Sequence, residues 1–372
     1  MTGRELSLLQ AAHAHPGLTR AAAARMLNIS TGAATELVTR LGAAALLSER
    51  PALPTGTRGR PTQELAPHPA GPLVLACSIS YEHWQLDVVQ LGGESIATTG
   101  AAHPGAAAEP VLASIAEAVA DARRRFGERI RGLGVSAPGT IRDGHVLDAV
   151  TLGWQAVDLR RIWPGGELTV VDNDANLAAV AEARRGAGRE AALAMHLHID
   201  AGLGGAVIAE GRMLAGAHRS AGEFGHMPFG DPAVECPCGA HGCWGLTVDG
   251  GELARLLHVA PPREPITFAQ AVIARAAQGA EREARAVDRV AANLGRGIAG
   301  LVNAFDPDVI TLSGLADPIL GCSPGPLLAA YHSGLMSARR DDPPPILPSV
   351  VGDAGPLVGA SEQVWDRLWP TF

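Results

Sequence analysis

Residues 221–245 read AGEFGHMPFGDPAVECPCGAHGCWG and hold three of the chain's five cysteines, Cys236, Cys238 and Cys243. The spacing Cys-x-Cys-x4-Cys is too tight for thiols scattered through a core, and His226 lies ten residues before it. Three thiolates and one imidazole fill the four positions of a tetrahedral zinc ion and leave no place for water, so the pattern predicts structural zinc. His241 competes with His226 as fourth ligand, and three reduced cysteines without metal are the alternative.

Two motifs in this stretch resemble the signature of the ROK family, named for repressors, open reading frames and kinases of sugars. They are E-x-G-H at residues 223–226 and C-x-C-G-x-x-G-C at residues 236–243. The resemblance implies that His226 binds zinc and also faces a sugar, and that Glu223 is a further sugar contact. Zinc would then hold the sugar-binding loop in shape. The family motif ends in C-x-E, but Gly245 stands at the last position here, so one sugar contact is missing.

The bulk composition predicts a globular cytoplasmic protein with two or three domains. The chain has 372 residues, of which 47% are hydrophobic. It has no apolar run long enough for a membrane span and no signal-peptide pattern, so no membrane insertion is expected. The net charge of −8 is uneven, because residues 1–70 hold seven arginines against four glutamates, a net of +3, which leaves −11 for the rest. A basic head on an acidic body suggests that the head meets a polyanion.

Residues 1–66 are predicted to form a winged helix-turn-helix DNA-binding domain. One helix is expected before residues 15–17, a second from Thr19 to Leu27 and a third from Ser30 or Thr31 to about Leu41. An arginine-rich hairpin at residues 54–61 follows, and this order is the plan of a winged helix-turn-helix. The head also resembles the N-terminal module of ROK repressors. The alternative is a three-helix protein-interaction module with an arginine-rich linker.

The third helix is expected to enter the DNA major groove by its N-terminal turns. Thr31, Ala34 and Thr35 are the candidate groove-facing residues, and Arg40 could meet phosphate. On the wing, Arg58 and Arg60 could reach phosphate or the minor groove.

The body alternates strand and helix patterns, which predicts an α/β architecture. Strands are expected at 73–80, 84–90, 131–136, 168–171, 192–199, 206–209 and 309–312, and helices at 111–126, 177–185, 267–278, 282–305 and 360–368. The ROK resemblance implies a two-lobed actin/hexokinase-like (ribonuclease H-like) fold with its ligand between the lobes. The first lobe would comprise residues 67–173 plus 356–372. The second would comprise residues 174–355 and carry the zinc loop.

The resemblance also assigns sugar contacts and a vestigial catalytic base. Asp174 matches the base of ROK sugar kinases, while Asn173 and Gly139 match positions that contact or shape the sugar site. A plain helix N-cap is the alternative role of Asp174. Trp154 also sits where the family shapes the sugar mouth.

The phosphate loops depart from the kinase pattern. The first loop of ROK kinases, D-x-G-G-T-K, is replaced by CSISYE at residues 77–82, and the second, G-T-G-x-G-G, by DAGLGG at residues 200–205. Asp200 therefore puts an anion where a triphosphate would lie, a repulsion on the order of a few kcal/mol in a low-dielectric cleft. ATP-dependent catalysis is not expected, and no residue is assigned a catalytic role.

These patterns together favour a transcriptional regulator, with a repressor of sugar-uptake or sugar-catabolism genes as the first hypothesis. Its partners would be double-stranded operator DNA and a sugar or sugar-phosphate effector, and it would act as a homodimer or homotetramer with one structural zinc per chain. The alternatives are a DNA-binding regulator controlled by a protein partner without sugar, which the missing glutamate at Gly245 favours, and an ATP-dependent hexose kinase.

Overall fold

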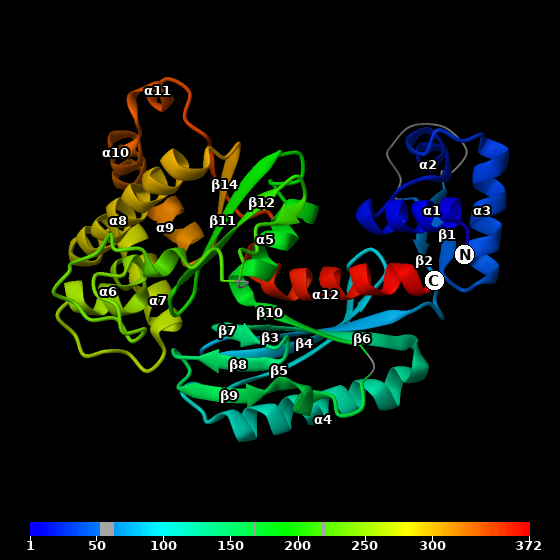
Figure 1. Cartoon of the computed structure of the whole chain (residues 1–372), viewed down its shortest axis with the longest axis horizontal. Coiled ribbons are helices and arrows are strands. Elements are labelled where there is room, and N and C mark those ends of the chain that lie inside the picture. The colour runs from blue at the N-terminus through cyan, green and yellow to red at the C-terminus, as the bar shows by residue number, and fades with distance from the viewer. Residues whose placement is uncertain (53–62, 167, 218–219) are drawn as a thin grey trace.

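The structure is a computed structural model that describes residues 1–52, 63–166, 168–217 and 220–372. A small helical head lies beside a body of two lobes (Figure 1). The body is a mixed α/β fold with one five-stranded sheet in each lobe, as the predicted alternation of strands and helices indicated. In the part of the chain described, no helix has both the length and the apolar character needed to cross a membrane.

The head contains three helices and a two-stranded sheet. Helix α1 spans Gly3–Ala14, α2 Arg20–Met26 and α3 Thr31–Ala43, while β1 (Leu47–Pro51) pairs antiparallel with β2 (Gln63–Pro67). Side chains at the helix starts accept hydrogen bonds from free backbone N–H groups, Thr19 from Ala22 and Ser30 from Ala33. The predicted caps are therefore confirmed, with Ser30 as the cap of the third helix.

The first lobe is built on a five-stranded sheet in the order β10-β6-β3-β4-β5. Its strands are β3 (Leu73–Ile79), β4 (His83–Gln90), β5 (Ser95–Ala102), β6 (Ile130–Ala137) and β10 (Thr169–Asn173). Alternate residues of β3 enter different cores, because side chains along a strand point to opposite faces. One face packs on α4 (Ala108–Phe126) and the other on α12 (Gly355–Leu368). A small sheet of β7 (Thr140–Arg142), β8 (Val146–Ala149) and β9 (Trp154–Asp158) follows β6, and two 3-10 turns, η1 (Gly127–Arg129) and η2 (Leu159–Ile162), complete the lobe.

The second lobe has a five-stranded sheet in the order β13-β12-β11-β14-β15. Its strands are β11 (Leu193–Ile199), β12 (Leu203–Ala209), β13 (Arg212–Met213), β14 (Val309–Gly314) and β15 (Ile346–Pro348). Its helices are α5 (Asp174–Arg185), α6 (Gly250–Leu256), α7 (Pro265–Ala277), α8 (Glu281–Phe305), α9 (Ala316–Cys322), α10 (Pro324–Gly334) and α11 (Ser337–Arg340). The short turns η3 (Phe224–His226), η4 (Trp244–Thr247) and η5 (Gly352–Ala354) punctuate it, and η6 (Trp369–Thr371) follows α12.

The head and the body share one hydrophobic core. Leu8 and Leu9 of α1 belong to the same buried cluster as Trp365 and Leu368 of α12. At the edge of this cluster, His13 of α1 lies 3.2 Å from both carboxylate oxygens of Glu362, a residue of α12 that is 3% exposed. The head is therefore packed against the first lobe as well as linked to it by the chain.

Candidate functional site

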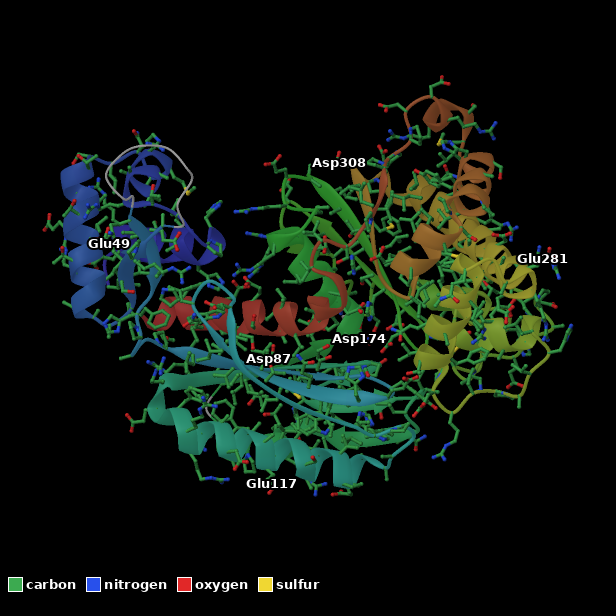
Figure 2. The ribbon with its side chains drawn as sticks, turned by 180° about the vertical axis from the view of Figure 1, so that it is seen from behind. Glu49, Asp87, Glu117, Asp174, Glu281 and Asp308 are labelled. Atoms are coloured by element: carbon green, nitrogen blue, oxygen red, sulfur yellow. The ribbon has the colours of Figure 1, made fainter. Side chains whose placement is uncertain are left out.

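A cleft of about 1210 Å³ lies between the two lobes. All five residues predicted to contact a sugar line it: Gly139, Asn173, Asp174, Glu223 and His226. They come from the end of β6, the start of α5 and the turn η3. Asp174 lies where the two lobes meet (Figure 2).

The start of α5 supplies two of these residues. Asn173 is the N-cap, and its side-chain oxygen accepts hydrogen bonds from the backbone N–H groups of Ala175 and Asn176. Its amide nitrogen donates to the carbonyl oxygen of Gly139 at 3.1 Å, so Asn173 ties the start of the helix to the loop that follows the neighbouring strand β6. Asp174 is the first residue of the helix and is half-buried, with one carboxylate oxygen 2.8 Å from the N–H of Ala175.

Gly139 is required by its backbone. Its φ of +116° is disfavoured for side-chain-bearing residues, and an added Cβ would stand 2.4 Å from the carbonyl oxygen of Asp148 in β8. The glycine thus lets β8 approach the cleft wall closely. Trp154, which the resemblance placed near the sugar mouth, is buried in the first-lobe core, with its indole N–H donated to the carbonyl oxygen of Ala106.

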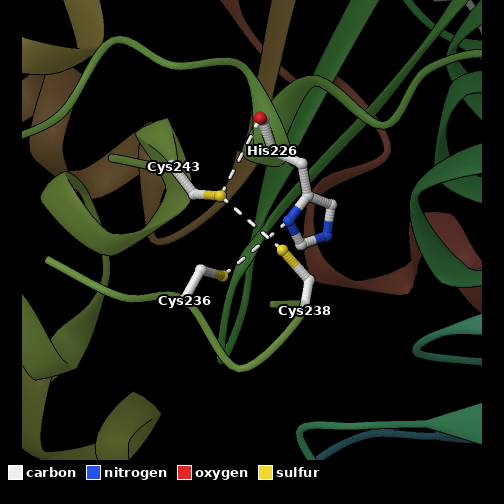
Figure 3. A group of neighbouring side chains, drawn as sticks. All are labelled: His226, Cys236, Cys238 and Cys243. Atoms are coloured by element: carbon white, nitrogen blue, oxygen red, sulfur yellow. Dashed lines mark hydrogen bonds between the residues drawn. The ribbon is translucent and has the colours of Figure 1, made fainter. Parts of the chain in front are cut away.

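The three cysteines and His226 converge into one cluster (Figure 3). One ligand atom from each lies within 4.8 Å of the others. The sulfurs of Cys238 and Cys243 are 3.7 Å apart, and His226 Nδ1 is 3.9 Å from the sulfur of Cys236. His241 is not part of this cluster.

The donor set fits a tetrahedral zinc ion. A tetrahedron with Zn–S bonds of about 2.3 Å has S···S edges of about 3.8 Å, close to the separation found here. The sulfurs are too far apart for a disulfide, whose bond is about 2.05 Å. Burial and the neighbouring thiols raise the pKa of Cys243 to about 12, so a set of three thiolates requires a cation to offset their mutual repulsion. Cys236, Cys238, Cys243 and His226 would hold the ion, whose chemistry there is structural.

His226 connects this cluster to the cleft. Its Nδ1 faces the sulfurs, while its Nε2 lies 3.8 Å from a carboxylate oxygen of Glu223. The two predicted sugar contacts therefore stand side by side. At Gly245 an added Cβ would lie 3.3 Å from the carbonyl oxygen of Gly225, so this position leaves little room beside the motif.

At the position of the first phosphate loop, Glu82 forms hydrogen bonds that join the two lobes. Glu82, in the β3–β4 turn, is buried, and its carboxylate accepts hydrogen bonds from the backbone N–H groups of Ile266 and Thr267 and from the Thr267 hydroxyl. These groups open α7 in the second lobe, whose own N-cap residue makes no side-chain cap. A carboxylate at this place accepts hydrogen bonds from the free N–H groups of the helix, and its negative charge is stabilised by the positive end of the helix dipole. The sequence analysis missed this role of Glu82.

The second phosphate-loop position brings another acid into the cleft. Burial, with the nearby charges of Asp174, Glu82 and Asp353, raises the pKa of Asp200 to about 8. A ligand atom of Asp200 lies within 4.8 Å of ligand atoms of Asp174 and His198. Sequence reasoning did not single out His198, because alternation along a strand does not reveal which residue opens into a cleft.

The predicted DNA contacts fall into different environments. Thr31 and Thr35 are exposed at the start of α3. The prediction for Ala34 is wrong: it is 0% exposed, because it shares the buried face of α3 with Leu37, Val38 and Leu41.

Of the three arginines predicted to contact DNA, the structure describes Arg40. Arg40 is half-exposed and forms ion pairs with Glu5 at 3.4 Å and Glu36 at 3.2 Å. Arg58 and Arg60 lie outside the described residues.

Comparisons with known proteins place the chain among sugar kinases and repressors. The ROK family model matches residues 76–366. The chain is 32% identical over 200 residues to a glucokinase of Halalkalibacterium halodurans, a match that covers 49% of this chain and 61% of the relative. It is 26% identical over 242 residues to the xylose repressor of Bacillus subtilis, covering 64% of this chain and 62% of the relative. These matches thus span less than two thirds of either relative.

Of two similar solved structures, one matches about four fifths of this chain and the other matches nearly the whole chain. A ROK family glucokinase from Streptomyces griseus, in complex with glucose and AMPPNP, matches 79% of this chain and 99% of its own, with TM-score 0.67 and 25% identity. A ROK family transcriptional regulator, a homologue of the E. coli MLC protein, matches 99% of this chain and 98% of its own, with TM-score 0.71 and 18% identity. At that identity the second match shows the fold alone.

Proposed function

The chain belongs to the ROK family, and we propose that it is a DNA-binding transcriptional regulator, a repressor of sugar-uptake or sugar-catabolism genes whose ROK domain senses a sugar or sugar phosphate. Both repressors and kinases share this fold, so the proposal depends on features that separate the two activities.

The remodelled phosphate loops carry the proposal. A kinase needs backbone N–H groups and a metal-holding acid around the transferred phosphate. Here the carboxylate of Glu82, in the first loop, caps α7 in the other lobe. Asp200, in the second loop, lies close to Asp174. The bonds of Glu82 bridge the lobes without nucleotide. These features support a body that holds its lobe arrangement with its own side chains.

The head supports the DNA-binding part of the proposal. Helices α2 and α3 are joined by four residues and followed by the β1–β2 hairpin, which is the order of a winged helix-turn-helix. Thr31 and Thr35 stand exposed on the first turns of α3, where a recognition helix meets base edges. With few long polar side chains on that helix, we expect methyl contacts and DNA shape to contribute much of the specificity.

Helix α5 supports a route from effector to head. It begins at Asp174 in the cleft and ends at Arg185, about 18 Å away for twelve residues of α-helix. Arg185 donates hydrogen bonds to Glu362 and to the backbone carbonyls of His13 and Gly92. A sugar that moved the start of α5 would therefore act on the joint that holds the head.

The test is fluorescence anisotropy of a labelled DNA fragment from upstream of the protein's own gene, titrated with full-length protein in the presence and absence of a panel of sugars and sugar phosphates. We expect specific binding that one effector releases. Thr35→Glu should weaken binding at least tenfold, because it adds a negative charge to the face of α3 that we propose enters the DNA major groove. Thr99→Glu on β5, an exposed threonine outside the head, is the matched control and should leave binding unchanged.

The other outcomes select the alternatives. Specific binding that is indifferent to every sugar would favour control by a protein partner, which the absence of the motif glutamate at Gly245 supports. Binding no stronger than to random DNA would overturn the proposal. A sugar-dependent release of ADP from ATP would then identify a kinase.

A further inference from the structure

Three metal-binding side chains converge in the cleft outside the cysteine cluster. Asp174 opens α5, His198 lies near the end of β11, and Asp200 follows that strand. One ligand atom from each lies within 4.8 Å of the other two. Among the described residues no hydrogen bond joins any two of the three, and neither aspartate forms an ion pair. The donors therefore surround a common point without satisfying one another.

His198 is the feature that points to a ligand. The side chain is buried, with 7% exposed, and its Nδ1 lies 2.7 Å from the hydroxyl of Ser313. In the part of the chain that the structure describes, its other ring nitrogen, Nε2, has no hydrogen-bond partner. Because His198 also lines the cleft, this buried side chain has a ring nitrogen without a partner available there.

A chain of buried hydrogen bonds determines which nitrogen of His198 carries the proton. Thr311 donates its hydroxyl to the carbonyl oxygen of Met195, so it accepts from Nδ1–H of His196 at 2.8 Å. In an imidazole whose Nδ1 donates, the other ring nitrogen is the acceptor, so Nε2 of His196 accepts. Ser313 therefore donates to that Nε2 at 2.8 Å and must accept from Nδ1–H of His198. The lone pair of His198 is thereby assigned to Nε2.

We propose that Asp174, His198 and Asp200 form a second metal site, which binds a divalent transition-metal ion in the cleft. The site offers two carboxylate oxygens and one imidazole nitrogen, a mixed donor set that suits manganese, iron or zinc better than magnesium or calcium. The hydrogen bond from Nδ1–H to Ser313 is the outer contact by which proteins orient a histidine ligand. The thiolate cluster differs in chemistry, so the two sites can be loaded separately.

The ion would alter what the cleft can do. It would place a positive charge among the acids of the cleft, and it would occupy Asp174, the residue at the position of the kinase base. The site shares Asp174 with the proposed sugar site, but its test measures metal binding directly, so it can fail while the proposed function stands, and the reverse.

The test is titration of Mn²⁺ into zinc-loaded full-length protein, followed by electron paramagnetic resonance. Binding removes Mn²⁺ from the population of aqueous ions that gives the six-line spectrum. The loss of that signal during the titration gives the stoichiometry and the affinity. We expect one Mn²⁺ per chain, and at least tenfold weaker binding in Asp200→Asn, a substitution of the same shape. Asp143→Asn is the matched control: it removes an exposed carboxylate from the same cleft lining at a φ of +52°, which asparagine tolerates, and should leave the affinity unchanged.

A second measurement does not depend on any variant. Pulsed paramagnetic resonance of the bound Mn²⁺ should show coupling to one ¹⁴N nucleus, that of His198. Circular dichroism and zinc content check that Asp200→Asn is folded. No bound Mn²⁺, equal affinity in wild type and Asp200→Asn, or a bound ion without nitrogen coupling would each overturn the proposal.

Discussion

Glu362→Gln should loosen the joint between head and body. The carboxylate of Glu362 accepts hydrogen bonds from Arg185 at 2.5 and 2.8 Å and lies 3.2 Å from Nε2 of His13. Because the N–H of Gly92 donates to Nδ1 of His13, the proton of that ring is on Nε2 and is donated to Glu362. Glutamine keeps the shape of the side chain but removes the charge that balances the guanidinium of Arg185.

The expected cost follows from the pKa of the carboxyl group. Burial by itself would raise the pKa of Glu362, but the hydrogen-bond and charge interactions with His13 and then with Arg185 outweigh it and lower the pKa from 4.5 to about 2. At ~1.36 kcal/mol per unit, this shift contributes about 3 kcal/mol to the free energy of unfolding at pH 7. Removing one partner of a buried ion pair costs about 3–5 kcal/mol in other proteins, a consistent range.

The assay is thermal unfolding of both proteins as a function of pH. At pH 7 a loss of about 3 kcal/mol should lower Tm by about 5 °C or more. Since the folded-state pKa lies below the unfolded value, the stabilisation is complete above pH 4.5 and is lost as the pH falls toward 2. The difference in unfolding free energy between wild type and Glu362→Gln should therefore narrow to about half at pH 3.

A surface pair provides the control for this experiment. Glu281 is 88% exposed in its side chain and pairs with Arg285 one helical turn away, so Glu281→Gln should change the unfolding free energy by less than about 0.5 kcal/mol. Hydrogen exchange of the α1 amides should accelerate in Glu362→Gln and not in Glu281→Gln. An unchanged Tm at pH 7, or a Tm difference that is the same at pH 7 and pH 3, would refute the assignment of Glu362 as the charged centre of the joint.

Three further substitutions test other parts of the molecule. Cys236→Ser should lower zinc content and Tm together while Cys322→Ser, outside the cluster, keeps both; unchanged zinc stoichiometry would remove Cys236 from the ligand set. Glu82→Gln should cost about 1 kcal/mol in urea denaturation and speed hydrogen exchange of the first amides of α7, because a charged cap is lost, and unaltered exchange there would contradict the contact. Gly359→Ala places a Cβ 1.9 Å from the carbonyl oxygen of Leu177, so separating α12 from α5 should cost about 1–3 kcal/mol, whereas a wild-type Tm would show that the helices adjust freely.

Local chemistry made some helix starts predictable. Thr19 and Asn173 cap their helices because short polar side chains reach free N–H groups within the same turn, a relation visible in sequence. Strand β5 was missed, since residues 95–102 alternate little and lie mostly exposed at the edge of the sheet, where burial imposes no pattern. The small sheet at residues 140–158 was missed because its strands are three to five residues long.

Site residues that belong to a short sequence motif could be predicted. Contacts between residues that are far apart in the sequence could not. The resemblance named five candidate sugar contacts, which all line the cleft, and the metal motif named His226 and the three cysteines. Glu82 and Thr267 are 185 positions apart, and no local pattern relates a turn to a helix start at that distance. Ala34 shows the opposite error: the N-terminal turns of α3 were assigned to DNA without counting which positions share a face with Leu37 and Leu41.

The shared core determines what kind of regulation this architecture permits. A head on a flexible linker would reorient independently of the lobes, because a random chain transmits no torque. Here α1 packs on α12 in one buried cluster, and α12 meets α5 backbone to backbone at Gly359. Close-packed interiors shift between discrete arrangements and do not deform continuously, so the head must follow α12. An effector could then act only through its difference in affinity for two lobe arrangements. Under the proposed function, variants in α5 or α12 should therefore lose the effector response while DNA binding remains, and variants on the exposed face of α3 should lose DNA binding while effector binding remains.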